Sequence, residues 1–106
     1  MYLSESDKAK IIESCRRNDI SFCALFGSFA RGEADEKSDI DLLVRFSQPK
    51  GFDWLNAALE IEATLGRKVD LVTDRMLGKY IRDNVMRDLQ VIYEETGQQT
   101  SSLSYS

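Results

Sequence analysis

The stretch from Gly27 to Val44 constrains the fold of this chain more than any other segment. It reads GSFARGEADEKSDIDLLV, so a Gly-Ser pair follows one apolar run and two aspartates begin the next. A third aspartate, Asp70, stands inside a later apolar run. Strands disfavour aspartate, and such conflicts between a residue and its setting tend to mark functional positions. The pattern therefore predicts β-strands whose aspartates belong to a functional site.

Helical and strand patterns alternate along the rest of the chain. In chain order they predict a helix that starts behind a capping box at Ser4 and ends near residue 18, strands over 20–26 and 39–46, a helix over 52–65, a strand over 69–73, a last helix after Asp74 and a short strand over 91–93. Residues 48–51 read as a turn. This order predicts an α/β sandwich, in which a small mixed sheet of three to four strands packs against helices. The helix between strands 39–46 and 69–73 favours a parallel crossover.

Alternation and helical spacing also predict which side chains face the core. In the second strand Ile40, Leu42, Val44 and Phe46 are expected to point one way, and Asp39, Asp41, Leu43 and Arg45 the other. The helix over 52–65 is expected to turn Leu55, Leu59 and Leu65 inward, and Gly66 to end it. The last helix is expected to carry Leu77, Tyr80, Ile81 and Val85 on one face.

Length and composition bound the function. The 106 residues indicate one domain over 1–95, followed by a flexible, polar tail over 96–106. A domain this small buries only about two-thirds of its unfolded surface, so an enzyme of this size is expected to borrow pocket walls from a partner or a second subunit. A homo- or hetero-oligomer is therefore compatible with the chain.

Charge and residue types exclude several classes. A net charge of −4 argues against stable nucleic-acid binding, which needs clustered positive charge. No segment reaches the ~20 apolar residues of a membrane span, and the N-terminus lacks a signal-peptide pattern, so the expected location is the cytoplasm. Cys15 and Cys23 fit no zinc motif and are expected to be reduced and partly buried. Because histidine is absent, catalysis would need carboxylates, hydroxyls, lysine or arginine.

Three acids form the candidate metal and catalytic set: Asp39, Asp41 and Asp70. Asp39 and Asp41 lie two apart on a strand, so their side chains leave the same face. If the strand of Asp70 is the neighbour, like charges ~4 Å apart repel by about 4 kcal/mol, which requires a cation or protonation. Hard oxygen ligands select Mg²⁺ or Mn²⁺. Taken alone, each acid is more typical of a solvated strand edge, and the conjunction is what favours a site.

The Gly27–Ser28 pair is the candidate phosphate-binding turn. Glycine lets backbone approach a ligand closely, and the serine hydroxyl adds a donor for a phosphate oxygen. Alone, the pair is more typical of an ordinary strand-ending glycine with a serine cap, and its place directly before the acid strand is what favours a phosphate-binding role. Among nearby cations, Arg31 is a better candidate to contact phosphate than Lys37 or Arg45, because it closely follows the Gly-Ser turn. A solvated surface charge is nevertheless the commoner role of such residues.

The spacing Gly27-Ser28, ten residues, Asp39-x-Asp41, with Asp70 as a later strand acid, resembles the nucleotidyltransferase superfamily of DNA polymerase beta type. The fuller text is similar to its minimal nucleotidyltransferases. The resemblance implies a nucleotidyltransferase fold, nucleotide binding at Gly27 and Ser28, two Mg²⁺ ions on Asp39 and Asp41, and activation of the attacking hydroxyl by Asp70. It also implies ATP as substrate and a HEPN-type RNase toxin as partner, with AMP transferred to a toxin tyrosine.

Three other functions stay open on the sequence. The chain could neutralise a toxin by contact alone, or transfer a nucleotide to a small molecule such as an aminoglycoside. The second of these usually needs an extra helical domain to hold the acceptor. A nucleic-acid polymerase ranks lower, given the acidic composition.

Overall fold

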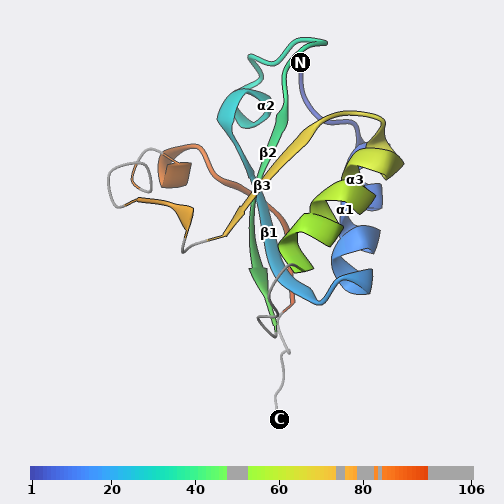
Figure 1. The fold of residues 1–106 in the computed structure, drawn as a ribbon. Helices are drawn as coiled ribbons and strands as arrows, with labels where there is room; N and C mark the ends of the chain where they lie inside the picture. The colour runs from blue at the N-terminus through green and yellow to red at the C-terminus, as the bar shows by residue number, and fades with distance from the viewer. Residues whose placement is uncertain (48–52, 74–75, 79–82, 84, 96–106) are drawn as a thin grey trace.

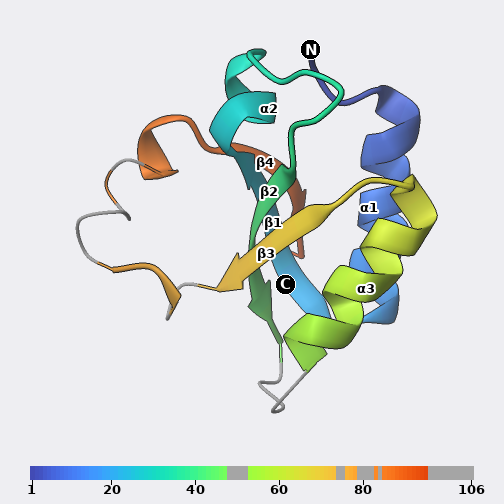
Figure 2. The same cartoon turned by 45° about the horizontal axis from the view of Figure 1, so that its top comes forward.

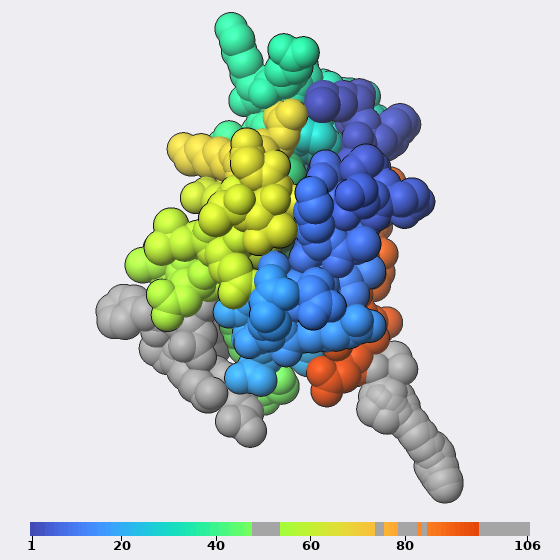
Figure 3. Space-filling view, turned by 90° about the vertical axis from the view of Figure 1, so that its right-hand side faces the viewer, coloured from blue at the N-terminus to red at the C-terminus, as the bar shows by residue number. Residues whose placement is uncertain are grey.

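Two helices cover one face of a four-stranded sheet (Figure 1). The computed structural model describes residues 1–47, 53–73, 76–78, 83 and 85–95. Its elements in chain order are α1 (Glu5–Arg17), β1 (Ile20–Phe26), α2 (Gly27–Arg31), β2 (Ile40–Phe46), α3 (Asp53–Leu65), β3 (Val69–Thr73) and β4 (Gln90–Glu94). Helices α1 and α3 lie side by side on the sheet, as Figure 2 shows, and together they form the outer face seen in Figure 3. The predicted α/β class is confirmed.

The sheet is mixed, with strand order β3-β2-β1-β4. Strand β1 runs antiparallel to both of its neighbours, β2 and β4. Strands β2 and β3 run parallel, as the helical crossover between them predicted. The short last strand predicted over 91–93 is also confirmed, because β4 spans Gln90–Glu94.

Helix α1 begins where the capping signal predicted. The Ser4 side chain accepts a hydrogen bond from the Asp7 backbone N–H at 3.0 Å, which satisfies one of the free donors of the first turn. Further along, Cys15 packs into the core, where Cys23 of β1 is also buried, and both thiols are free. The thiols are unpaired as expected, but both are fully buried rather than partly buried.

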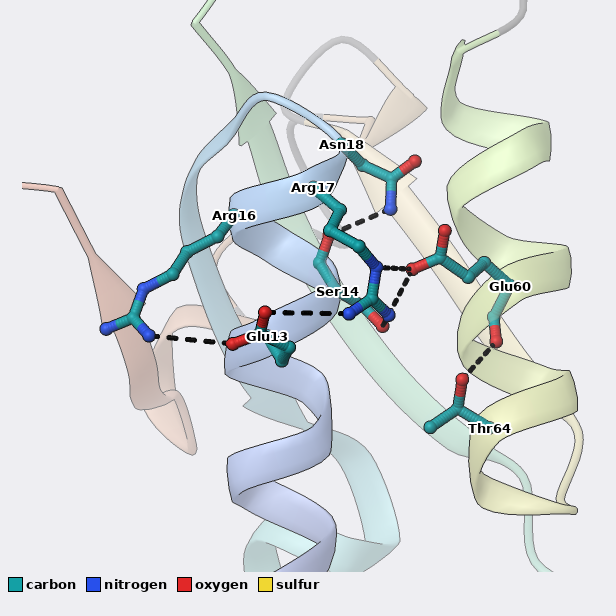
Figure 4. A network of polar contacts seen from close by, with 7 residues as sticks. All are labelled: Glu13, Ser14, Arg16, Arg17, Asn18, Glu60 and Thr64. Carbon is teal, nitrogen blue, oxygen red and sulfur yellow. Dashed lines mark hydrogen bonds and ion pairs between the residues drawn. The ribbon is translucent and has the colours of Figure 1, made fainter.

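A polar network joins the C-terminal end of α1 to the middle of α3 (Figure 4). Arg17 reaches across to the Glu60 carboxylate, with Nη2 to Oε2 at 2.8 Å. The same Arg17 nitrogen donates to the hydroxyl of Ser14 at 3.3 Å. Because Ser14 is fully buried, this contact gives its hydroxyl a partner, and a buried polar group without one would be costly. The network adds polar contacts between the two helices at the surface, outside their apolar core.

The main core lies between these helices and the sheet. Alternate positions of the strands enter it as predicted: Leu42 of β2 is fully buried and Leu71 of β3 is 3% exposed. Burying a side chain of this size contributes about 1.5–3 kcal/mol. Leu43, on the opposite face of β2, is also fully buried and lies outside this cluster. The second face of the sheet is therefore covered at its centre.

The predicted inner face of α3 is partly wrong. Leu55 and Leu59 are 42% and 55% exposed, whereas Ala57, Ala58 and Ile61 are buried. Leu65 does pack against the core, as predicted. The cause is the close packing of α3 against both β3 and α1, because small alanines allow a nearer approach than leucines would.

Other predictions fall outside the described residues. The turn at 48–51, the tail over 96–106 and the Tyr80 and Ile81 positions of the last helix lie there. Residues 83 and 85–87 are helical, and Val85 is buried as predicted. Leu77, however, lies in a bend outside any α-helix and is only half-buried, so its predicted place on the helix is wrong. Within the part of the chain that the structure describes, no helix combines the length and the apolar character that crossing a membrane requires.

Candidate functional site

A row of three side chains crosses the sheet at one end. Asp41 of β2 lies opposite Phe26 of β1 and opposite Asp70 of β3 in the strand register. Directly opposite residues project from the same face of a sheet, and neighbouring strands are about 4.8 Å apart. The two aspartates, 29 positions apart in the sequence, are therefore adjacent on one face.

This face is the one that α1 and α3 leave uncovered. The next row along the sheet contains Leu25, Leu42 and Leu71, which enter the core beneath the helices. Side chains alternate along a strand, so the row of Asp41 must point to the other side. Behind it on that side lie Ala24 and Leu43, both fully buried. The carboxylates thus lie next to buried apolar side chains on the same face of the sheet.

Gly27 lets the Asp41 carboxylate lie directly against the backbone. Its φ of +74° falls in the left-handed region, which glycine adopts without strain. A Cβ built at this position would overlap Asp41 Oδ2 and lie 3.1 Å from Asp41 Cγ. Any other residue would push the carboxylate away, so the glycine that ends β1 is specific to this arrangement.

The surroundings of Asp41 disfavour its negative charge. Burial, followed by the charges of Asp70 and Asp39, raises the pKa of Asp41 to about 6, and Arg31 opposes this in part. The carboxyl is half-buried, so losing water contributes more than either neighbour. A carboxylate whose negative charge is disfavoured by its surroundings is well suited to a ligand that brings positive charge.

Asp39 stands just outside the sheet. Strand β2 begins at Ile40, so Asp39 is the last residue of the preceding loop, and its side chain is exposed. Among the residues described, no three acidic, cysteine or histidine side chains lie close enough together to form a metal site. Of the three predicted acids, Asp41 and Asp70 are adjacent in the strand register, and Asp39 lies outside it. Their oxygen atoms are the ligands that Mg²⁺ and Mn²⁺ prefer.

The predicted phosphate-binding residues lie beside this row. Ser28 is half-buried in the first turn of α2, and its carbonyl accepts the Glu33 N–H at 2.9 Å. Arg31, at the end of α2, pairs with Glu33 at 2.8 Å and with Asp88 at 3.5 Å. Its charge nevertheless reaches Asp41, where it lowers the pKa.

Two residues at this end of the sheet carry no signal in the sequence. Phe26 completes the row, but an aromatic residue at a strand end is ordinary. Arg67, in the connection from α3 to β3, bonds to the loop before Asp39. Only the strand register and the tertiary contacts reveal either position.

Comparisons with known proteins agree with this geometry. Residues 9–98 match the sequence profile of the family described as polymerase beta nucleotidyltransferase. A Methanocaldococcus jannaschii relative, MJ0435, provisionally named a protein adenylyltransferase, is 34% identical over 76% of this chain and 88% of its own length. Protein adenylyltransferase MntA of Thermococcus cleftensis is 41% identical over 61% of this chain and 67% of its own.

A solved structure extends the similarity to three dimensions. A chain from the crystal structure of a toxin–antitoxin with AMP-PNP superposes with a TM-score of 0.72 at 25% identity, covering 85% of this chain and 75% of that chain. The present chain belongs to the polymerase-beta-type nucleotidyltransferase family. It has the fold of that family and is a nucleotidyltransferase, as the sequence predicted.

Proposed function

We propose that this protein transfers AMP from ATP to a protein hydroxyl, and that the acceptor is a tyrosine of a HEPN-type RNase toxin. The protein would then act as the antitoxin. The observation that carries this is the placement of Asp41 beside Asp70 and against Gly27. Relatives named protein adenylyltransferases and a structural neighbour from a toxin–antitoxin complex support the choice of acceptor.

The three acids would hold the metal. Asp39, Asp41 and Asp70 supply the hard oxygen atoms for two Mg²⁺ ions, with Mn²⁺ as the alternative. Bound ions would neutralise the triphosphate and stabilise the charge that develops at the α-phosphate. Asp41, whose pKa is raised to about 6, is partly protonated near neutral pH and would ionise fully when a cation binds.

The chain's own residues would supply positioning and proton transfer. Gly27 leaves room for phosphate oxygens near the backbone, and the Ser28 hydroxyl would donate to them. Arg31 would leave its ion pairs with Glu33 and Asp88 and bind the leaving phosphates instead. Asp70 would accept the proton of the tyrosine hydroxyl, whose oxygen bonds to the α-phosphorus as the bond to pyrophosphate breaks. Catalysis would rest mainly on orientation and on electrostatic stabilisation.

The acceptor would enter over the face of the sheet that α1 and α3 leave uncovered, at the end where Asp70 lies. Asp70 lies on β3, an edge strand, and its side chain is exposed. An exposed base on an edge strand suits an acceptor that arrives on another protein, because the partner can supply the missing walls. A cytoplasmic location and the lack of stable nucleic-acid binding remain predictions of this proposal.

Labelled ATP tests the proposal directly. Purified protein with α-labelled ATP, Mg²⁺ and the protein encoded beside it should transfer label to that neighbour. The Asp39→Asn/Asp41→Asn variant should lose at least about 100-fold of this labelling, because charge stabilisation at the transition state is removed. Glu36→Gln is the matched control, since it removes an exposed acid of the same loop and should label normally.

The same variants separate enzymatic from contact-only neutralisation. If the protein acts by catalysis, the double variant fails to protect cells that express the toxin, while Glu36→Gln still protects them. Full protection by the double variant would instead support a binding module. Equal labelling by the double variant and the wild type would refute the assignment of these acids.

A further inference from the structure

Arg67 binds the backbone of the loop that leads to Asp39. It lies in the connection from α3 to β3, and its Nη1 atom donates to the backbone carbonyls of Asp35, Glu36 and Ser38 at 3.3, 3.0 and 3.1 Å. These partners are 29 to 32 positions away in the sequence. A single nitrogen thus donates hydrogen bonds to three carbonyls of one short loop.

The same guanidinium also contacts α2. Its carbon lies 5.2 Å from the centre of the Phe29 ring, a distance at which a cation over an aromatic face is attracted to it. Phe29 is 1% exposed and follows Ser28 directly. Arg67, just before β3, therefore contacts both α2, next to the candidate phosphate-binding turn, and the loop that leads to Asp39. Figure 2 shows α2, this loop and the α3–β3 connection at the same end of the sheet.

The loop is ordered internally but needs an outside anchor. Asp35 Oδ1 accepts hydrogen bonds from the Lys37 N–H at 2.8 Å and from the Ser38 hydroxyl at 3.2 Å. These bonds shape the turn without tying it to the sheet. The ties to the α3–β3 connection are the Ile40 N–H bond to the Lys68 carbonyl at 3.0 Å and the three Arg67 bonds.

Asp39 depends on that anchor more than its two partners do. Asp41 and Asp70 are fixed by strand pairing to each other, whereas Asp39 precedes the strand. Like charges on Asp41 and Asp70 would push an unrestrained Asp39 away. A side chain that holds the carbonyl of Ser38, the residue before Asp39, opposes this displacement.

We propose that Arg67 is a positioning residue that holds Asp39 in register with Asp41 and Asp70 for divalent-cation binding. This inference rests on the proposed function, because it assumes that the three acids bind one set of ions. Arg67 itself would touch neither metal nor nucleotide. It would set the geometry of the metal ligands through the loop backbone.

Arg67→Ala tests this with two readouts. Amide hydrogen exchange over residues 35–39 should accelerate about tenfold, while exchange in α1 stays unchanged, since exchange reports local opening. The affinity for Mn²⁺, measured by its paramagnetic signal at a temperature where the variant is fully folded, should fall about tenfold. Arg67→Lys keeps the charge but loses the planar contact with Phe29, and its values should fall between.

Arg16→Ala is the matched control. Arg16 is an exposed arginine on α1 that pairs with Glu13 at 3.7 Å, away from the site, and its loss should change neither readout. Faster loop exchange with unchanged Mn²⁺ affinity would reduce Arg67 to a purely structural role and overturn the inference. Unchanged loop exchange would overturn it as well. A wild-type protein that binds no Mn²⁺ would instead refute the proposed function, and the role of Arg67 with it.

Discussion

Asp41→Asn is expected to abolish nucleotidyl transfer and, at the same time, to make the folded protein more stable at neutral pH. The pKa of Asp41 is raised from 3.8 to about 6, first by burial and then by Asp70 and Asp39. An acid whose pKa is higher in the folded state favours folding while it is protonated. Its contribution is complete below pH 4 and is lost as the pH rises through about 6. Asparagine carries no charge at any pH, so it avoids this loss.

The size of the stability gain follows from the same pKa. The full difference between the folded and unfolded values would correspond to about 3 kcal/mol. Solvent screening of a half-buried carboxyl reduces the expected gain to about 1 kcal/mol. Urea unfolding without divalent cations should show the variant and the wild type equally stable near pH 4 and the variant more stable at pH 8. If the variant were less stable than the wild type at pH 8, ionised Asp41 would not be disfavoured by burial and by its acidic neighbours.

Gly27→Ala is expected to cost at least about 100-fold in transfer activity, a loss comparable with removing a key electrostatic group from an active site. The added methyl would overlap Asp41 Oδ2, so the carboxylate must swing out of the row. The left-handed φ of +74° adds a backbone cost of about 1–2 kcal/mol. Steady-state labelling and thermal unfolding together separate the two effects.

Gly66→Ala supplies the matched control for backbone strain. Gly66 ends α3 with a φ of +67°, and no heavy atom lies within 4 Å of the position of its Cβ. Its replacement should lower stability by a similar amount and leave most of the activity. If Gly66→Ala lost as much activity as Gly27→Ala, the close approach of Gly27 to Asp41 would not be the cause.

Local patterns predicted the fold well where one signal dominated. The Ser4 cap, the limits of β1 and β3 and the parallel pairing of β2 with β3 follow from capping, alternation and the crossover rule. The pairing also brought Asp70 beside Asp41, as the sequence suggested. These features depend on nearest neighbours in the chain or on a topological rule that few proteins break.

Features set by packing between distant segments were not predictable in this way. In α3, both the leucine pair at 55 and 59 and the buried set around Ile61 recur at four-residue spacing, so helical periodicity alone cannot choose between the two faces. Contact with α1 and β3 decides in favour of the alanines. Arg67 looks like an ordinary charged residue between two elements, and only its distant carbonyl partners reveal its place.

Metal-dependent thermal stability tests the central claim most directly. Mg²⁺ should raise the melting temperature of the wild-type protein at pH 7.5 and constant ionic strength, because a ligand that binds only the folded state stabilises it, by about 2.7 kcal/mol at 100 times its Kd. Asp70→Asn should remove most of this rise without unfolding the protein. No rise in the wild type, or an equal rise in both proteins, would show that the acids of β2 and β3 do not share a cation.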